Sequence, residues 1–161
     1  MSVFSFFRWL HILAGAGWLG EVIVIVFVLV PTISRLPRED RPSYIAEIFP
    51  RMFRLASVLA GLTIVAGAVI NYQLTHWINL GPYIRSFRGG AIVVGGLLGL
   101  ALALFHFFIE VRIESRVAGL ATTLDKKELA SLERYLTLIP RVGILVLFVI
   151  FILMMVGTRG L

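Results

Sequence analysis

Four long apolar stretches, separated by short polar segments, dominate the pattern of the chain. A helix rises 1.5 Å per residue, so about 20 apolar residues are enough to cross roughly 30 Å of hydrocarbon. Each stretch reaches this length, and we therefore expect four transmembrane helices. Pro31 is expected to end the first helix because proline lacks a backbone N–H group. The expected bounds are about Arg8 to Pro31, Arg54 to Trp77, Gly90 to Val111, and Pro140 to Thr158.

Two of the polar connections contain a short amphipathic pattern. The segment from Pro37 to Pro50 places apolar side chains at helical spacing, namely Tyr44, Ile45, Ile48 and Phe49. The segment from Thr123 to Leu136 places four leucines on roughly one side, namely Leu124, Leu129, Leu132 and Leu136. Apolar residues that repeat in this way predict amphipathic helices, which have one apolar face. We expect both segments to form short helices that lie on the membrane surface.

The composition supports a membrane environment and excludes several kinds of site. The chain is 59% apolar and 15% charged, whereas soluble chains are about 45–50% apolar and about 25% charged. Its mean hydropathy is +0.96. Because the sequence contains no cysteine, disulfides, thiolate-bound zinc and iron–sulfur clusters are excluded. Any cofactor has to be held by histidine, methionine, carboxylate or packing.

The basic residues indicate how the helices are oriented. Although the net charge is +6, these residues lie between the spans and form no single basic patch, so no nucleic-acid partner is expected. Four of them fall on one side of the four spans, namely Arg8, Arg85, Arg88 and Arg159. Eleven fall on the other side, namely Arg35, Arg38, Arg41, Arg51, Arg54, Arg112, Arg116, Lys126, Lys127, Arg134 and Arg141. The positive-inside rule places the eleven in the cytoplasm and both termini outside the cell membrane.

Together these patterns predict an all-α integral membrane protein with one domain over residues 1–161. Its four transmembrane helices are expected to form an up-down bundle, with short amphipathic surface helices in the two cytoplasmic loops.

Two histidines at the outer ends of the first two spans are candidate metal ligands. His11 and His76 are expected at compatible depths, and imidazole binds haem iron and copper well. Gly15 lies on the helical face of His11 and leaves room there for a flat ligand. Met154 or Met155 is an alternative ligand, either as the sixth ligand of a haem iron or as a soft ligand of copper. Three arginines are expected near the propionates of such a haem, namely Arg8, Arg85 and Arg88.

Two further ionisable residues lie deeper in the membrane. Glu21 and His106 are expected at nearly the same depth on different helices, so the two side chains are candidates for a pair. A charge at the centre of a span costs about 2.5–3.5 kcal/mol on insertion scales, so such residues usually have a functional or pairing role. Glu21 and His106 are therefore candidates for a second haem or for a quinone and proton site. The stripe of Gly95 and Gly99 near His106 fits helix packing better than a cofactor groove.

Part of the sequence resembles a known family of membrane domains. The stretches Trp9-Leu10-His11-Ile12 and Trp18-Leu19-Gly20, followed by Pro31, resemble the first helix of copper-resistance D (CopD-like) domains and of the related HemJ-type protoporphyrinogen oxidases. The stretch Arg51-Met52-Phe53-Arg54-Leu55-Ala56, with Gly67 after it, is similar to the start of their second helix.

This resemblance covers about 70 residues and implies a four-helix unit whose first-helix histidine, here His11, binds haem or takes part in copper handling. The chain departs from the pattern in two places. Glu21 stands where those families usually have glycine, and the third span has no lysine where HemJ-type proteins tend to carry one.

Three functions follow as expectations. The first is a b-type haem protein, with one or two haems, that passes electrons between a bilayer quinone or porphyrin and a partner; a haem-dependent oxidoreductase activity is one form of it. The second is copper binding or transport through His11, His76 and Met154 or Met155. The third is a non-catalytic accessory subunit of a larger membrane assembly such as a respiratory complex. A homo-oligomer is an alternative assembly.

Overall fold

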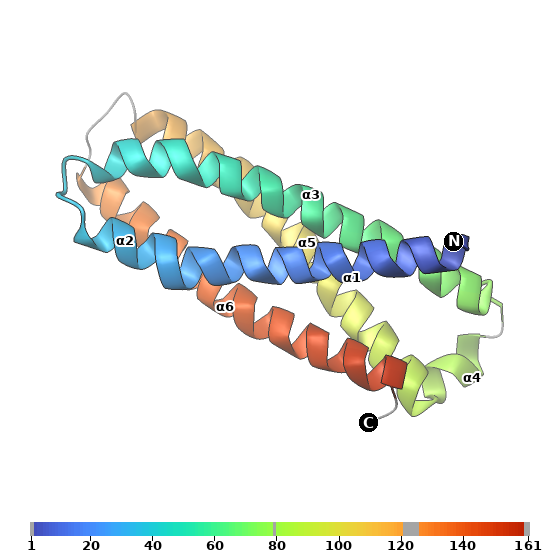
Figure 1. Ribbon diagram of the computed structural model, residues 1–161. Coiled ribbons are helices and arrows are strands. Elements are labelled where there is room, and N and C mark those ends of the chain that lie inside the picture. Colours follow the sequence, from blue (N-terminus) through green and yellow to red (C-terminus); the bar gives the residue numbers. More distant parts are fainter. Residues whose placement is uncertain (1, 79, 121–125, 160–161) are drawn as a thin grey trace.

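The computed structural model describes residues 2–78, 80–120 and 126–159. All regular secondary structure in these residues is helical (Figure 1). In chain order the elements are α1 Val3–Val24, the π-helical turn η1 Ile25–Leu29, α2 Val30–Arg35, α3 Arg41–Thr75, α4 Leu80–Arg85, α5 Phe87–Leu120 and α6 Lys126–Arg159.

Four continuous helical segments are long and apolar enough to cross a membrane. They comprise Val3–Arg35, Arg41–Thr75, Phe87–Ile113 and Lys127–Thr158. The sequence-based prediction of an all-helical membrane protein with four such helices is confirmed. The segments are longer than predicted, however. The helix α3, for example, has 35 residues. At 1.5 Å per residue it extends about 50 Å, which exceeds the roughly 30 Å of hydrocarbon.

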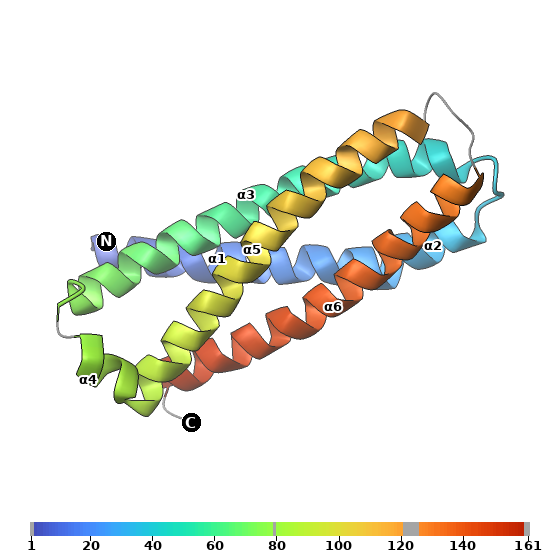
Figure 2. The same cartoon turned by 180° about the vertical axis from the view of Figure 1, so that it is seen from behind.

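The four long helices lie side by side in an elongated bundle. α1 packs along α3, α3 along α5, and α5 along α6. Figures 1 and 2 show the start of α1, the short helix α4 and the last turns of α6 toward one end. The connection from α2 to α3 and the first turns of α6 lie at the other end, which we call the basic end.

The two predicted surface helices do not form as separate elements. Tyr44, Ile45, Ile48 and Phe49 belong to the first turns of α3, which continues without a break through Pro50. Leu129, Leu132 and Leu136 belong likewise to the first turns of α6. The predicted Leu124 and residues 123–125 lie outside the described residues. The prediction was wrong because these apolar side chains pack against other helices: Ile45, Phe49 and Leu132 are fully buried.

Pro31 does not end the first span, which is a second difference from the prediction. The chain continues through the π-helical turn η1 into α2 and ends at Arg35. Within η1 the N–H group of Val30 donates to the carbonyl of Ile25, five residues back. This wider turn directly precedes Pro31, whose missing N–H group and ring would disturb a regular α-helix. The helix therefore passes the proline without a break.

Two hydrophobic clusters hold the bundle together. The mid-bundle cluster contains small residues that let the helices approach closely, and its buried members are Trp18, Val22, Ala56, Ala60, Ala103, Ile144 and Leu147. The basic-end cluster is built from larger side chains, and its buried members are Ile25, Ile33, Ile45, Phe49, Phe53, Ile113, Leu132 and Leu136. The π-helical turn η1 contacts both clusters, because Ile25 and Leu29 pack in the basic-end cluster and Val26 packs against the mid-bundle cluster.

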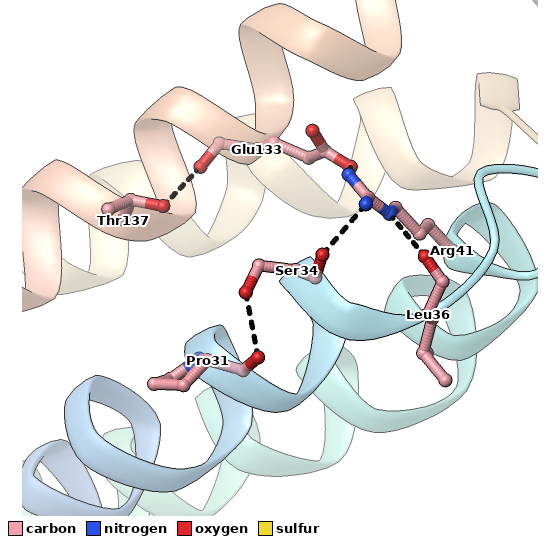
Figure 3. Close-up of polar contacts among 6 residues, drawn as sticks. All are labelled: Pro31, Ser34, Leu36, Arg41, Glu133 and Thr137. Atoms are coloured by element: carbon pink, nitrogen blue, oxygen red, sulfur yellow. Dashed lines mark hydrogen bonds and ion pairs between the residues drawn. The ribbon is translucent and has the colours of Figure 1, made fainter.

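One arginine ties three helices together at the basic end (Figure 3). Arg41, at the start of α3, donates from Nε to the carbonyl of Leu36 and from Nη2 to the carbonyl of Ser34, at 3.1 and 2.9 Å. Its Nη1 lies 3.2 Å from Oε1 of Glu133 on α6. Carbonyl groups at a helix C-terminus have no partner within the helix. Arg41 therefore caps the end of α2 and fixes it to α6.

Candidate functional site

Glu21 is the buried charged residue of the described chain, and its environment is unusual. It lies on α1 with only 6% of its surface exposed, on the same face as Trp18 and Ile25. Neither carboxylate oxygen has a hydrogen-bond partner among the described residues, and both are buried. A buried polar group without a partner costs free energy. Glu21 is therefore the first candidate for a residue kept for binding or chemistry.

A cavity of about 250 Å³ borders Glu21. Its wall comes from α1, η1, α3, α5 and α6, and it includes Trp18 next to Glu21 and the ring of Phe53. His106 contributes the imidazole of α5 to the same wall. The predicted neighbourhood of Glu21 and His106 is thus present, although the two side chains face a common cavity and do not form a hydrogen bond with each other.

The cavity opens on the outside of the bundle between α5 and α6. Four residues of its wall are also about half exposed, namely Phe105, Tyr135, Leu138 and Val142. Side chains that both line a cavity and reach the protein surface mark its mouth. All four belong to helical segments that are long and apolar enough to cross a membrane.

Pro140 and Gly143 shape the α6 side of the cavity. Pro140 lies inside α6 and has no N–H group to donate to the preceding turn. Gly143 lines the cavity, and a Cβ atom added to it would meet nothing within 4 Å. The glycine therefore leaves open space where any other residue would place a side chain.

His106 is held against α3 by two contacts of one ring nitrogen. Its Nε2 lies 3.3 Å from the carbonyl oxygen of Phe53 and 3.2 Å from Oγ of Ser57. The hydroxyl of Ser57 in turn donates to Oε2 of Glu110, one turn beyond His106 on α5. These three side chains form a polar chain between α3 and α5. The sequence places Glu110 on the stripe of His106, but nothing in it points to Ser57, which comes from another helix.

His11 faces α3 and fits closely there. Its Nδ1 lies 2.8 Å from the carbonyl oxygen of Thr63, and a Cβ atom on Gly67 would approach the ring to 3.0 Å. Glycine at position 67 therefore makes room for the imidazole. Gly15, which was expected to leave room for a flat ligand, instead faces the side chain of Thr63, whose Cγ2 would lie 3.6 Å from a Cβ atom at position 15.

His76 does not join His11. It is exposed and caps the C-terminus of α3 with a left-handed conformation, φ 46°. Its ring packs edge-on against Tyr72, with centroids 5.6 Å apart. Gly67, which contacts His11, lies nine residues earlier on α3, or about 13 Å along the helix axis. The expected two-histidine haem site is therefore not assembled, because the two rings lie at different levels.

The remaining predicted ligands are also dispersed. The methyl group of Met154 packs toward Gly95 of α5, Met155 is half-buried, and Arg8, Arg85 and Arg88 are exposed. Gly95 and Gly99 serve helix packing, since Met154 and Leu153 border the first and Ile64 borders the second. Among the described residues, no group of three or more histidine, aspartate or glutamate side chains gathers closely enough to hold a metal ion.

Comparison with known proteins gives one match. The family model described as "Domain of unknown function (DUF4149)" matches residues 13–119. This region includes Glu21, Ser57, His106 and Glu110. No curated protein and no solved structure matches the chain. The resemblance to CopD-like and HemJ-type proteins is not tested by these comparisons and stays a prediction.

Proposed function

The chain belongs to the DUF4149 family, whose description names no activity, and we propose from the chain's own geometry that it binds a lipid-soluble ring compound of the quinone class. The observation that carries this proposal is the carboxyl group of Glu21, which has no partner among the described residues and lies at the wall of a largely apolar cavity. The mouth of that cavity between α5 and α6 supports a ligand that arrives through the bilayer.

The size of the cavity favours a small ring system. Pockets for drug-sized ligands measure about 300–1,000 Å³, and this cavity has about 250 Å³. It suits one ring or two fused rings and is small for a porphyrin. The isoprenoid tail of a natural quinone would extend through the mouth into lipid.

The polar groups of the wall match the oxygens of a quinone. A protonated Glu21 donates a hydrogen bond to a quinone carbonyl, and an ionised Glu21 accepts one from a hydroquinone hydroxyl. His106 and Tyr135 are further polar groups of the wall. Trp18 and Phe53 supply aromatic surface against which a ring packs. Binding a ligand there would give the Glu21 carboxyl group a partner, which the described residues do not supply.

Electron transfer is the wider form of this proposal. Reduction of a quinone to a hydroquinone takes up two electrons and two protons. The electrons would come from a redox partner, either a haem or another protein of the membrane. The chain's own part is to hold the ring, exclude water and place Glu21 and His106 near its oxygens.

Quenching of tryptophan fluorescence tests ligand binding directly. The chain has three tryptophans; Trp18 lines the cavity and is 3% exposed, whereas Trp9 and Trp77 are each 60% exposed. In a Trp9→Phe/Trp77→Phe variant in lipid nanodiscs, we expect 2-methyl-1,4-naphthoquinone to quench Trp18 in a saturable manner. A matched variant that keeps only Trp77 should show linear quenching alone. Linear quenching of Trp18 as well would refute the proposal.

Haem binding at His11 is a second candidate, favoured by one contact. Because the carbonyl of Thr63 can only accept, Nδ1 of His11 carries the proton and Nε2 is left with a lone pair. Metal-bound histidines typically donate their other N–H group to such an acceptor. The same nitrogen would bind copper in the alternative proposal. His11 would act without His76, which lies elsewhere.

An absorbance spectrum and metal analysis test this second candidate. Purified protein reconstituted with haem should show a Soret band that the His11→Ala variant loses and the His76→Ala variant retains. Copper that is retained by the parent and lost from His11→Ala would support the copper alternative. If neither metal distinguishes His11→Ala from the parent, both metal roles fail. Stable co-purification with a larger assembly, without pigment or metal, would favour the accessory-subunit alternative.

We further propose that the basic end faces the cytoplasm. Eleven of the lysines and arginines belong to the two connections at that end or to the adjoining helix ends. The positive-inside rule then places α4 and both termini on the outer side of the cell membrane.

A further inference from the structure

The polar side chains next to His106 extend from the cavity toward the basic end, and ligand binding alone does not require them to do so. This polar chain begins at the cavity wall with His106, continues through Ser57 and ends at Glu110. Because α5 runs toward the basic end, Glu110 lies about 6 Å nearer to that end than His106. The exposed residues Arg54 and Arg112 lie within one turn of Ser57 and Glu110 respectively. These hydrogen-bonded side chains therefore lead from the cavity toward the membrane surface.

The direction of each hydrogen bond follows from the partners. The carbonyl of Phe53 can only accept, so Nε2 of the neutral His106 ring carries the proton. Nε2–H is then shared between that carbonyl and Oγ of Ser57. The hydroxyl proton of Ser57 is donated onward to Glu110. Nδ1 is consequently the basic nitrogen of the ring.

We propose that His106, Ser57 and Glu110 form a proton relay between the ligand cavity and the basic end of the bundle. A proton taken up at Nδ1 of His106 is matched by release of the Nε2 proton to Oγ of Ser57. The Ser57 hydroxyl proton passes at the same time to the Glu110 carboxylate. One proton enters, one reaches Glu110, and no electrons move; the His106 ring is left as its other tautomer, with the proton on Nδ1 in place of Nε2. Glu110 then exchanges its proton with water at the membrane surface.

The other titratable groups around His106 fit this arrangement. Glu21 of α1 and Tyr135 of α6 share the cavity wall with it, and α3 presents Ser57. Glu110 is the acidic group on the far side of Ser57. Glu21 is thus placed on the cavity side of the relay and Glu110 on its surface side. This inference rests on the proposed quinone function for the source of the proton.

Hydrogen exchange at the His106 ring tests the relay without any ligand. The chain has three histidines, so 15N-histidine labelling gives the signals of three imidazole rings, which variants lacking each histidine assign. In the parent protein, the Nε2 proton of His106 should exchange with water through Ser57 and Glu110. In Ser57→Ala and in Glu110→Gln we expect exchange to slow about tenfold or more, given the 10²–10⁴-fold contributions typical of positioned acid–base groups.

Two controls separate a relay from a structural role. Ser57→Thr keeps the hydroxyl and should restore rapid exchange. Glu47→Gln, which alters an exposed carboxylate on the first turns of α3, should leave exchange unchanged. Loss of a purely structural hydrogen bond would loosen His106 and leave exchange equal or faster in Ser57→Ala and Glu110→Gln, which would overturn the relay. Slow exchange in Ser57→Thr would also overturn it. Because no quinone is present, this result is independent of the fluorescence test.

Discussion

Replacing Gly143 by phenylalanine should weaken binding of the naphthoquinone. Gly143 lines the cavity, and the space where its Cβ would lie is open. The introduced ring would therefore enter the volume of about 250 Å³ that the ligand needs. Forcing extra atoms into a filled space typically costs about 1–3 kcal/mol, which corresponds to a loss of affinity of roughly 5- to 150-fold.

The same substitution elsewhere provides a matched control. Gly96 on α5 likewise has nothing within 4 Å of the place a Cβ atom would take, but it is exposed and lies outside the cavity wall. Gly96→Phe should bind the naphthoquinone like the parent in the Trp18 assay. Thermal unfolding of both variants would show that each is folded. Equal affinity of Gly143→Phe and the parent would contradict the placement of the ligand in this cavity.

Replacing Glu21 by leucine should stabilise the protein and weaken ligand binding. The carboxyl group is buried and has no partner among the described residues, so an apolar side chain of similar size removes an unfavourable burial. A buried polar group that has no partner costs about 1–3 kcal/mol, so removing it should stabilise the protein by about this amount. Without Glu21 the ligand would lose a hydrogen-bond partner, at about 1.5–3 kcal/mol. Affinity for the naphthoquinone should therefore fall about 10- to 150-fold.

Glu110→Leu gives the contrasting result. Glu110 accepts a hydrogen bond from Ser57, so its removal leaves a partner unsatisfied and should destabilise the protein. Denaturation of the purified variants in detergent gives both changes in stability, and the Trp18 assay gives both affinities. The interpretation of Glu21 would be wrong if Glu21→Leu lost stability while its affinity stayed at the parent value.

Much of the fold could be predicted from the sequence because membrane insertion leaves a strong local signal. An apolar run of about 20 residues is visible without knowledge of any tertiary contact. The ends of the helices could not be predicted in the same way. Pro31 and Pro50 usually mark boundaries, but here the π-helical turn η1 and the continuous helix α3 carry the chain past them. The amphipathic pattern of Ile45 and Phe49 is the same for a lipid surface and for a protein core.

A residue of the site could be predicted only where its own type and position in the sequence were enough to identify it. Glu21 is conspicuous because a carboxyl group inside an apolar span has to be compensated. The relation of His106 to Ser57 depends on the packing of α5 against α3, which spacing along one helix does not reveal. Likewise, His11 and His76 have suitable positions in the sequence, but α3 presents Thr63 and Gly67 to His11. The expected depth of the two histidines was thus less informative than the residues that face them on the neighbouring helix.

The π-helical turn η1 brings Ile25 and Ile33 to nearly the same side of one continuous helix. In a regular helix, with 100° per residue, Ile33 would be rotated about 80° from Ile25. The surplus residue of the wider turn removes most of this angle, and both isoleucines reach the basic-end cluster. A loop at this position could correct the same phase, but its free backbone groups would bring water beside Glu21. Correction within the helix leaves the backbone beside Glu21 helical.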